Sequence, residues 1–471
     1  MVDKIEVCNP RTGKIDYWIT PPTGDQLAEI CTRLRKAQVA WQESGLEKRI
    51  QAMQDWKKAI LSHKDELTEA LVVDTGRLSE SRIEVDSFLS SIDRWCRFAP
   101  DLLHTESRST AVPFIRLEQQ LVPYPLVGVI SPWNFPLLLS AIDAIPALLT
   151  GCAVIVKPSE ITLRFMQPLT KTIDAVPQLR DILTYIPGGG DIGSALVESV
   201  DLVCFTGSVA TGRKVAEAAA KRFIPAFLEL GGKDPAIVLA SADIELATSA
   251  ILWGSVINAG QSCLSIERIY VAESICSLFV EKLVAKAKNL KLAYPSLEEG
   301  QIGPIIAEKQ VEIIAEHLRD AVEKGALVHC GGAVEKLEGG FWCHPTVLTQ
   351  VNHSMKIMTE ESFAPIMPVM AFSHRKDAIS LANDTSYGLS AAIFSGSEAE
   401  AIEVANQIDA GAISINDAGL TAFIHEAEKN AFKLSGMGSS RMGAASLTRF
   451  MRKKAFLIKT NSFVDPWWFE I

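Results

Sequence analysis

The residue with the clearest capacity for covalent chemistry is Cys263, which follows the small and polar segment 259–262. Such surroundings suit a thiol that must meet a substrate, whereas inert cysteines more often lie in apolar runs, as Cys204 does. A thiolate attacks carbonyl carbons, so the residue types predict a covalent acyl intermediate. A single cysteine is more often structural, and the prediction therefore depends on the segments around it.

Two glycine-containing segments could approach phosphate groups. Residues 188–193 match the pattern G-x-G-x-x-G, but no acidic residue ends the strand-like run that follows, so we interpret them as a glycine turn after Pro187. Residues 205–212 join the end of a predicted strand to an amphipathic helix that begins near Arg213. Free backbone amides at a helix start suit a pyrophosphate, although neither segment alone identifies a cofactor.

Several further segments gain meaning together with Phe205-Thr206-Gly207-Ser208. Their order and spacing resemble those of the aldehyde dehydrogenase superfamily over nearly the whole chain, in its hydrolytic branch that does not use coenzyme A. Two of them are similar to the family's E-x-F-x-P and K-x-S-G-x-G segments, namely Glu361-Ser362-Phe363-Ala364-Pro365 and Lys433-Leu434-Ser435-Gly436-Met437-Gly438. The others are Ser131-Pro132-Trp133-Asn134-Phe135-Pro136, Lys157-Pro158-Ser159-Glu160, Leu228-Glu229-Leu230-Gly231-Gly232-Lys233 and Gly260-Gln261-Ser262-Cys263.

The resemblance implies roles for two catalytic candidates. It makes Cys263 the nucleophile, and it assigns the side-chain amide of Asn134 and the backbone N–H of Cys263 to the oxyanion that forms on attack. Collapse of that adduct sends a hydride to a nicotinamide and leaves a thioester. The alternative for Asn134 is a turn residue within a proline-flanked segment.

A thioester needs a base that activates water, and Glu229 is the candidate. It stands among Phe227, Leu228 and Leu230, and a desolvated carboxyl group is poised between its charged and neutral forms. A helix-capping or ion-paired glutamate is the alternative, which the two glycines that follow disfavour. Family branches that pass the acyl group to coenzyme A look different at this position, so we expect hydrolysis.

The resemblance also implies a nicotinamide cofactor. Lys157 and Glu160 follow a strand-like run where the family places the adenosine ribose, and a glutamate there accepts ribose hydroxyls and repels a 2′-phosphate. NAD is therefore expected over NADP, although family members can break that rule, and a surface ion pair is the alternative reading. The implied contacts to pyrophosphate, nicotinamide ribose and nicotinamide are Gly207, Ser208, Glu361 and Phe363, with Trp133 and Leu230 lining the cleft.

The segment 416–433 departs from the family, because it lacks the P-F-G-G run that often precedes the lysine. This segment borders the substrate mouth in the family. Apolar residues expected to wall the tunnel predict an aromatic or long-chain aldehyde, retinal-like or isoprenoid aldehydes included, unless these residues are plain core packing. They are Phe135, Leu138, Leu139, Ile142, Trp253, Leu264 and Phe423.

The elements that must position these residues follow from periodicity. Apolar spacing predicts that amphipathic helices open the chain, over 26–41, 47–63 and 67–95, followed by an exposed hairpin between 104 and 125. Short β-branched runs then alternate with helical segments, which is typical of β-α-β units and parallel sheets. The predicted strands are 127–130, 153–156, 183–186, 202–205 and 236–239, then 268–271, 346–348, 366–370, 392–394 and 413–416.

We therefore expect an α/β fold of the aldehyde dehydrogenase type, with a cofactor-binding domain, a catalytic domain and a small β arm. The expected cofactor domain is 1–104 with 123–230, and the catalytic domain is 231–435. The arm and tail are 105–122 and 446–471, and the family habit predicts a homodimer or homotetramer. The basic run 448–460 beside Phe463, Trp467, Trp468 and Phe469 is read as a subunit-pairing strand with an aromatic tail, with membrane-surface contact as the alternative.

Bulk composition narrows the function classes. A length of 471 residues with 48% hydrophobic side chains predicts more than one core, and a net charge of −10 disfavours nucleic-acid binding. Nine cysteines without a C-x-x-C pair indicate reduced thiols in the cytoplasm and no metal site. The charged N-terminus predicts no export signal, and prolines interrupt the apolar stretch 126–156, so we expect no transmembrane segment.

Three functions remain open on the sequence alone. The leading one is the hydrolytic dehydrogenase; the second is a short-chain, semialdehyde-specific or acyl-transferring relative, and the third is a retired dehydrogenase kept as an NAD-binding structural protein. The presence of Cys263, Glu229 and Asn134 favours the first.

Overall fold

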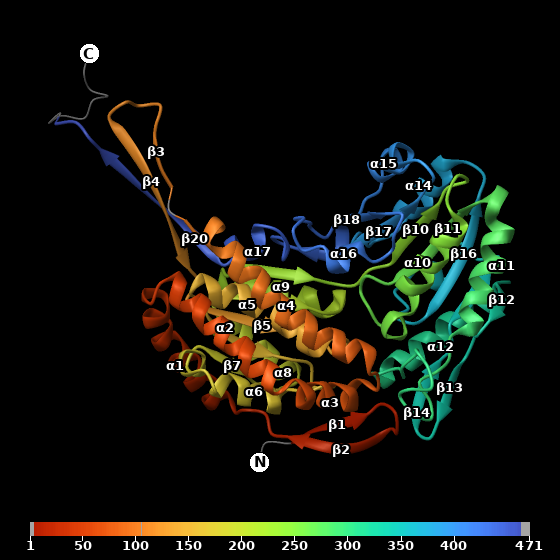
Figure 1. The fold of residues 1–471 in the computed structure, drawn as a ribbon, viewed down its shortest axis with the longest axis horizontal. Coiled ribbons are helices and arrows are strands. Elements are labelled where there is room, and N and C mark those ends of the chain that lie inside the picture. The colour runs from red at the N-terminus through yellow and green to blue at the C-terminus, as the bar shows by residue number, and fades with distance from the viewer. Residues whose placement is uncertain (1–3, 105, 463–471) are drawn as a thin grey trace.

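The computed structural model describes residues 4–104 and 106–462, which form two α/β units and a projecting β arm (Figure 1). Each unit is built around its own hydrophobic core, and the change from one core to the other falls between Leu230 and Ala236. Leu447 and Phe450 belong to the first core, so the chain returns to the first unit near its end. The predicted α/β fold with parallel sheets and a β arm is confirmed.

The chain opens with an antiparallel hairpin, β1 (Ile5–Asn9) and β2 (Lys14–Ile19), where we predicted only helices. The prediction was wrong because this hairpin is short and mostly exposed, and the helical spacing that we followed begins only at residue 26. Gly13 in its turn has φ +64°, and a Cβ there would lie 2.4 Å from the Gly339 carbonyl oxygen, so the hairpin tip packs on the second unit.

Four helices follow: α1 (Gly24–Glu43), α2 (Leu46–Ser62), α3 (Lys64–Thr75) and α4 (Ser79–Leu102). Thr23 and Gln26 form a capping box that starts α1. The helix predicted over 67–95 is two helices, since Gly76 adopts φ 72° and ends α3. A left-handed residue of this kind terminates a helix, and glycine adopts it without strain.

The first unit contains a six-stranded sheet in the order β19-β9-β8-β5-β6-β7. Its strands are parallel except for the pair of β19 with β9. The strands are β5 (Leu126–Ile130), β6 (Ala153–Lys157), β7 (Leu183–Tyr185), β8 (Leu202–Thr206), β9 (Ala226–Glu229) and β19 (Gly436–Met437). The intervening helices are α5 (Pro136–Thr150), α6 (Met166–Asp174), α7 (Pro177–Arg180), α8 (Gly190–Ser199) and α9 (Val209–Arg222).

The second unit contains a seven-stranded sheet in the order β12-β15-β16-β11-β10-β17-β18, parallel except at β12. Its strands are β10 (Asp234–Val238), β11 (Ile266–Ala272), β12 (Leu327–Cys330), β15 (Thr346–Thr349), β16 (Ile366–Phe372), β17 (Ser390–Phe394) and β18 (Ala412–Ile415). A separate hairpin joins β13 (Val334–Leu337) and β14 (Gly340–Cys343). The helices are α10 (Ile244–Val256), η1 (Ile257–Gly260), α11 (Glu273–Asn289), α12 (Glu308–Glu323), α13 (Lys356–Thr359), α14 (Arg375–Asn383) and α15 (Glu398–Ala405).

The last part of the chain runs from the second unit back along the first (Figure 1). It contains α16 (Leu420–Phe423), η2 (Lys433–Ser435), β19 and α17 (Ala445–Thr448). The predicted hairpin of β3 (Glu106–Ser109) and β4 (Ile115–Pro123) is present, and β20 (Met451–Lys459) pairs with β4 along its whole length. The resulting three-stranded arm projects from the body at the upper left. The aromatic tail at 463–471 lies outside the described residues.

Within the described ranges, no helix combines the length and apolar character that crossing a membrane requires.

Candidate active site

The loop that carries Cys263 is fixed by its backbone and by buried amides. Asn258, Ala259 and Gly260 all have positive φ, and a Cβ on Gly260 would lie 2.1 Å from the backbone carbon of Ala364. Gln261 is fully buried, donates to the carbonyls of Asn258 and Pro304, and accepts from the Ile306 N–H. The small and polar segment before Cys263 therefore forms a rigid turn. Position 260 of this turn has room only for glycine.

The loop after Glu229 passes between Cys263 and Glu361. A Cβ on Gly231 would lie 2.6 Å from a carboxylate oxygen of Glu361, and a Cβ on Gly232 would lie 2.5 Å from the Cys263 carbonyl oxygen. The two glycines therefore permit a close approach of three chain segments. Glu229 itself is the last residue of β9, whose position beside β8 places it opposite Thr206.

Asn134 is buried at the start of α5 and its amide Nδ2 donates to the Gln261 carbonyl at 3.0 Å. Its own carbonyl accepts from Arg77 Nη2 at 2.7 Å and from Asn258 Nδ2 at 2.9 Å. These bonds orient the side chain beside the Cys263 loop. The amide carries a second N–H, which a neighbouring oxyanion can use.

The thiol of Cys263 is half-buried, and its surroundings oppose ionisation. Burial, followed by the carboxylates of Glu361, Glu229 and Asp234, raises the pKa of Cys263 to about 12, against a smaller opposite effect of Arg441. Cys263 is thus a neutral thiol near pH 7, and a base must take its proton when it attacks.

One pocket of about 140 Å³ brings most of the predicted residues together. Its walls come from both units, so it lies where the two meet. Of the predicted residues it is lined by Trp133, Asn134, Leu139, Gly207, Ser208, Glu229, Leu230, Cys263, Glu361 and Phe363.

The segment with Glu361 and Phe363 is held by a buried ion pair. Lys233 Nζ lies 2.5 Å from Oε2 of Glu267, which also accepts from the Ser362 N–H at 2.7 Å, and Oε1 of Glu267 accepts from the Phe363 N–H at 2.8 Å. Burial and, second, the Glu267 carboxylate raise the pKa of Glu361 to about 8, against the opposing hydrogen bond from the Gly232 N–H. The Phe363 ring meets Trp133 edge-on at 5.6 Å.

The strand-turn-helix predicted at 205–212 is present. Ser208 caps α9, because its hydroxyl accepts from the Thr211 N–H at 3.3 Å. Of residues 188–193, which we interpreted as a glycine turn, only Gly188 and Gly189 connect β7 to the next helix, and α8 begins at Gly190. Lys157 and Glu160 do not line the pocket; the buried Lys157 Nζ donates to the Gly188 carbonyl at 2.6 Å and lies 3.6 Å from Glu160.

Of the predicted tunnel residues only Leu139 lines this pocket. Trp253 and Phe423 form an aromatic pair outside it, with ring centroids 5.7 Å apart and exposed fractions of 40% and 52%. Phe135 lies under the Arg77 guanidinium, and Ile142 is buried in α5. Leu138 and Leu264 are half-buried.

The structure adds residues that the sequence did not single out. Gln310 and Thr206 line the pocket, and Gln310 Nε2 donates to the Ser362 carbonyl. Arg441 Nε lies 3.8 Å from a carboxylate oxygen of Glu229. Burial lowers the pKa of Lys429, and the negative charges of Glu229 and Cys263 oppose part of that shift. The sequence could have pointed to Lys429, because it is a charged residue within the segment 416–433, which departs from the family.

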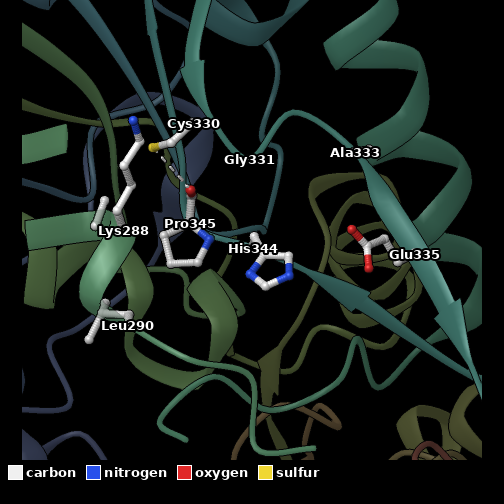
Figure 2. Close-up of a pocket in the computed structure, with 9 residues that line it drawn as sticks. Lys288, Leu290, Cys330, Gly331, Ala333, Glu335, His344 and Pro345 are labelled. Atoms are coloured by element: carbon white, nitrogen blue, oxygen red, sulfur yellow. Dashed lines mark hydrogen bonds between the residues drawn. The ribbon is translucent and has the colours of Figure 1, made fainter. Parts of the chain in front are cut away.

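A larger hollow, of about 290 Å³, lies elsewhere, between the end of α11 and strands β12 and β13 (Figure 2). Lys288, Cys330, His344 and Glu335 line it, and Cys330 Sγ contacts the Pro345 carbonyl at 3.5 Å. None of these residues belongs to the segments that carry the resemblance. Among the described residues, no group of three His, Cys, Asp or Glu side chains could hold a metal ion.

The family model described as "Aldehyde dehydrogenase family" matches residues 2–456. The chain belongs to the aldehyde dehydrogenase family. This aldehyde dehydrogenase is an oxidoreductase, as the sequence resemblance predicted.

Two curated relatives show how varied the similar proteins are. This aldehyde dehydrogenase is 37% identical over 395 residues to a 4,4'-diapolycopene aldehyde oxidase from a Methylomonas species, covering 82% of this chain and 73% of that one. It is 32% identical over 459 residues to a protein of Mycolicibacterium smegmatis provisionally named an NADP-type succinate-semialdehyde dehydrogenase, covering 97% and 89%.

Solved structures agree with the fold of this aldehyde dehydrogenase. A protein from Anabaena variabilis, provisionally described as an aldehyde dehydrogenase, is 67% identical and superposes with a TM-score of 0.98 over 99% of this chain and 100% of that one. A betaine aldehyde dehydrogenase from Staphylococcus aureus in complex with NAD+ is 30% identical, with a TM-score of 0.93 over 99% and 93%.

Proposed function

We propose that this aldehyde dehydrogenase converts an aldehyde to a carboxylic acid through a thioester on Cys263, with Glu229 as the base that releases the product. The observation that carries the proposal is the shared pocket, since a nucleophile, an amide donor and a carboxylate all line it. The three come from separate parts of the chain, and the bonds described above fix the two loops that carry Cys263 and Asn134.

In the first half of the reaction, sulfur forms a bond to the aldehyde carbon and the carbonyl electron pair moves to oxygen. Because the pKa of Cys263 is about 12, its proton must pass to solvent water during attack, which leaves Glu229 ionised for the second half. The free N–H of Asn134 and the backbone N–H of Cys263 stabilise the oxyanion. A nicotinamide cofactor, when bound, accepts the hydride.

In the second half, water attacks the thioester carbon. Glu229 accepts the water proton, the tetrahedral adduct collapses, and the bond between carbon and the Cys263 sulfur breaks to release the acid. The half-buried position of Glu229 at the end of β9 lets its carboxylate reach both the pocket and the residues behind it.

The pocket residues fit a dinucleotide. Ser208 and the first turn of α9 offer backbone amides to a pyrophosphate, and Trp133 and Phe363 offer aromatic rings beside a nicotinamide. Glu361 would hold the nicotinamide ribose. We infer a preference for NAD over NADP, because the half-exposed carboxylate of Glu160 would accept ribose hydroxyls and repel a 2′-phosphate.

For the substrate we infer an apolar aldehyde, aromatic or long-chain. The exposed pair of Trp253 and Phe423 supports this, since it offers ring surface at the segment that departs from the family. The similarity to a diapolycopene aldehyde oxidase points the same way.

A specific observation favours a second candidate, a semialdehyde. The charges of Glu229 and Cys263 act on the pKa of the half-buried Lys429, whose ammonium donates a long hydrogen bond of 3.3 Å to the Thr421 carbonyl. A substrate carboxylate could pair with it. The similarity to a protein named for succinate semialdehyde agrees with this candidate.

We also infer that residues 1–104 and 123–230 bind the cofactor, that 231–435 form the catalytic domain, and that the arm serves a homodimer or homotetramer. Leu457 on β20 is 73% exposed, which suits burial against a second copy. Light scattering of wild type and Leu457→Asp would report the assembly, and nine unpaired thiols fit a cytoplasmic location.

The test of the function is NADH absorbance at 340 nm with NAD or NADP and propanal, decanal, benzaldehyde, retinal or succinate semialdehyde. The proposal expects reduction of NAD that favours large apolar aldehydes and is lost in Cys263→Ala. Preference for succinate semialdehyde, lost in Lys429→Met, would support the second candidate. Activity that persists in Cys263→Ala would contradict the thioester.

A further inference from the structure

Arg441 lies directly behind Glu229, in the loop between β19 and α17. Its side chain is buried, and its Nη2 donates to Thr206 Oγ1 at 2.6 Å and to Asp143 Oδ2 at 3.2 Å. Its Nε lies 3.8 Å from Glu229 Oε1. That Nε is buried and has no hydrogen-bond partner among the described residues.

Arg441 is held in place by groups other than Glu229. Asp143 is a single acid in the apolar helix α5, and its two carboxylate oxygens bind Arg441 and Arg449 separately. Thr206 fixes the same guanidinium nitrogen from β8, one strand from Glu229. The position of the guanidinium, with its unpartnered Nε 3.8 Å from Glu229 Oε1, is therefore set by the groups around it.

The other groups that face Glu229 cannot take this role. The Cys263 thiol lies across the pocket and would carry the acyl group. Lys429 belongs to the substrate-mouth segment, where its ammonium donates to the Thr421 carbonyl. Among residues 4–104 and 106–462, Arg441 alone forms an ion pair with Glu229, and a shift of under about 1 Å would bring Nε and Oε1 within hydrogen-bond distance.

We propose that Arg441 is a positioning residue for Glu229 in thioester hydrolysis: its Nε–H holds Oε1, and the other carboxylate oxygen is left to accept the proton of the attacking water. This rests on the proposed function. The water oxygen bonds to the thioester carbon, its proton moves to Glu229, and the carbon–sulfur bond breaks. Arg441 touches neither substrate nor sulfur.

The experiment compares the two halves of the reaction in full-length Arg441→Gln. Rapid mixing with aldehyde and NAD should give a burst of about one NADH per subunit, then turnover at least tenfold slower than wild type. Intact mass spectrometry should show an acyl adduct on the protein. Arg441→Lys keeps the charge, and it should restore part of the turnover and reduce the adduct.

Arg449→Gln is the matched control, because it removes the other cation of Asp143 without a contact to Glu229. In Arg449→Gln the NADH burst and the steady-state turnover should fall by the same factor, and no acyl adduct should accumulate. The inference is overturned if Arg441→Gln also loses both in parallel without adduct, or if Arg449→Gln accumulates adduct equally. Glu229→Gln distinguishes a failure of this inference from a failure of the proposed function. If Glu229→Gln accumulates adduct and Arg441→Gln does not, only the role of Arg441 is refuted. If Glu229→Gln accumulates none, the proposed hydrolysis fails with it.

Discussion

The loop of Cys263 and the segment 416–433, which we propose to border the substrate mouth, differ in how they are held. The first is enclosed by buried amides and by glycines with no room for a Cβ. The second has one short helix, α16, and exposes Phe423 and Ile424 by about half. The difference indicates that the chemistry depends on a rigid backbone, whereas substrate choice depends on exposed side chains that can change at little cost to folding.

The largest expected effect is from Gly260→Ala in the rigid loop. Its φ of +71° and the 2.1 Å approach to Ala364 combine backbone strain with a clash, so we expect activity to fall at least about 100-fold and the free energy of unfolding to fall by about 3 kcal/mol. Gly325→Ala is the control, because φ is +97° there but nothing lies within 4 Å of the added Cβ. It should cost about 1 kcal/mol in urea unfolding and leave activity intact; equal losses in both variants would refute the role of the clash.

The next effect concerns the cofactor end of the site. Replacing Glu160 by Gln removes the charge that would repel a 2′-phosphate, so the ratio of kcat/KM for NADP to that for NAD should rise about tenfold. Measuring both cofactors in wild type and Glu160→Gln checks this. Glu398→Gln, at the exposed start of α15, is the control and should not move the ratio. An unchanged ratio in Glu160→Gln would remove the basis for the NAD preference.

A smaller effect should appear in the reactivity of the thiol. Because the pKa of Cys263 is about 12, its alkylation by iodoacetamide should rise with pH through pH 10 without a plateau. Glu361 raises this pKa only when ionised, and its own pKa is about 8, so Glu361→Gln should react several-fold faster than wild type above pH 8 and alike below pH 7. Labelling of Cys263→Ala measures the contribution of the other cysteines. A plateau near pH 8 in wild type would contradict the expected environment of the thiol.

The smallest effect is expected in the substrate-mouth segment. Phe423→Ala should raise KM for decanal or retinal about threefold with little change for propanal, since only large apolar aldehydes reach its ring. Its free energy of unfolding should stay within about 0.5 kcal/mol of wild type, because the side chain is half-exposed. Leu457→Ala on the arm is the control for exposed apolar surface. A uniform loss for all aldehydes would show that this segment also supports the rigid loop.

Much of the fold was predictable because β-branched runs between helical segments identify parallel strands locally. Strand β9 was not, since Ala226–Glu229 is short, partly buried and ends at two glycines. Its pairing with β19 joins residues far apart in sequence, which periodicity cannot report. The same holds for Arg441 and Asp143, although a lone acid in the apolar helix α5 signals a buried cationic partner.

The site residues also differ in how far the sequence could predict them. Motif order predicted the residues that line the pocket around Cys263, because those residues form the rigid loops. Tunnel residues were predicted less well: Trp253 and Phe423 lie outside this pocket, and Ile142 is buried in α5. Apolar side chains suit a tunnel wall and a core equally, so residue type alone could not distinguish them.

The most direct test of the central claim is mass spectrometry of Glu229→Gln mixed with NAD and a good aldehyde substrate, followed by proteolysis. The account predicts one NADH per subunit and an acyl mass on the peptide that contains Cys263, with wild type carrying far less of it. Normal turnover of Glu229→Gln without any acyl peptide, or an acyl group on another cysteine, would contradict it.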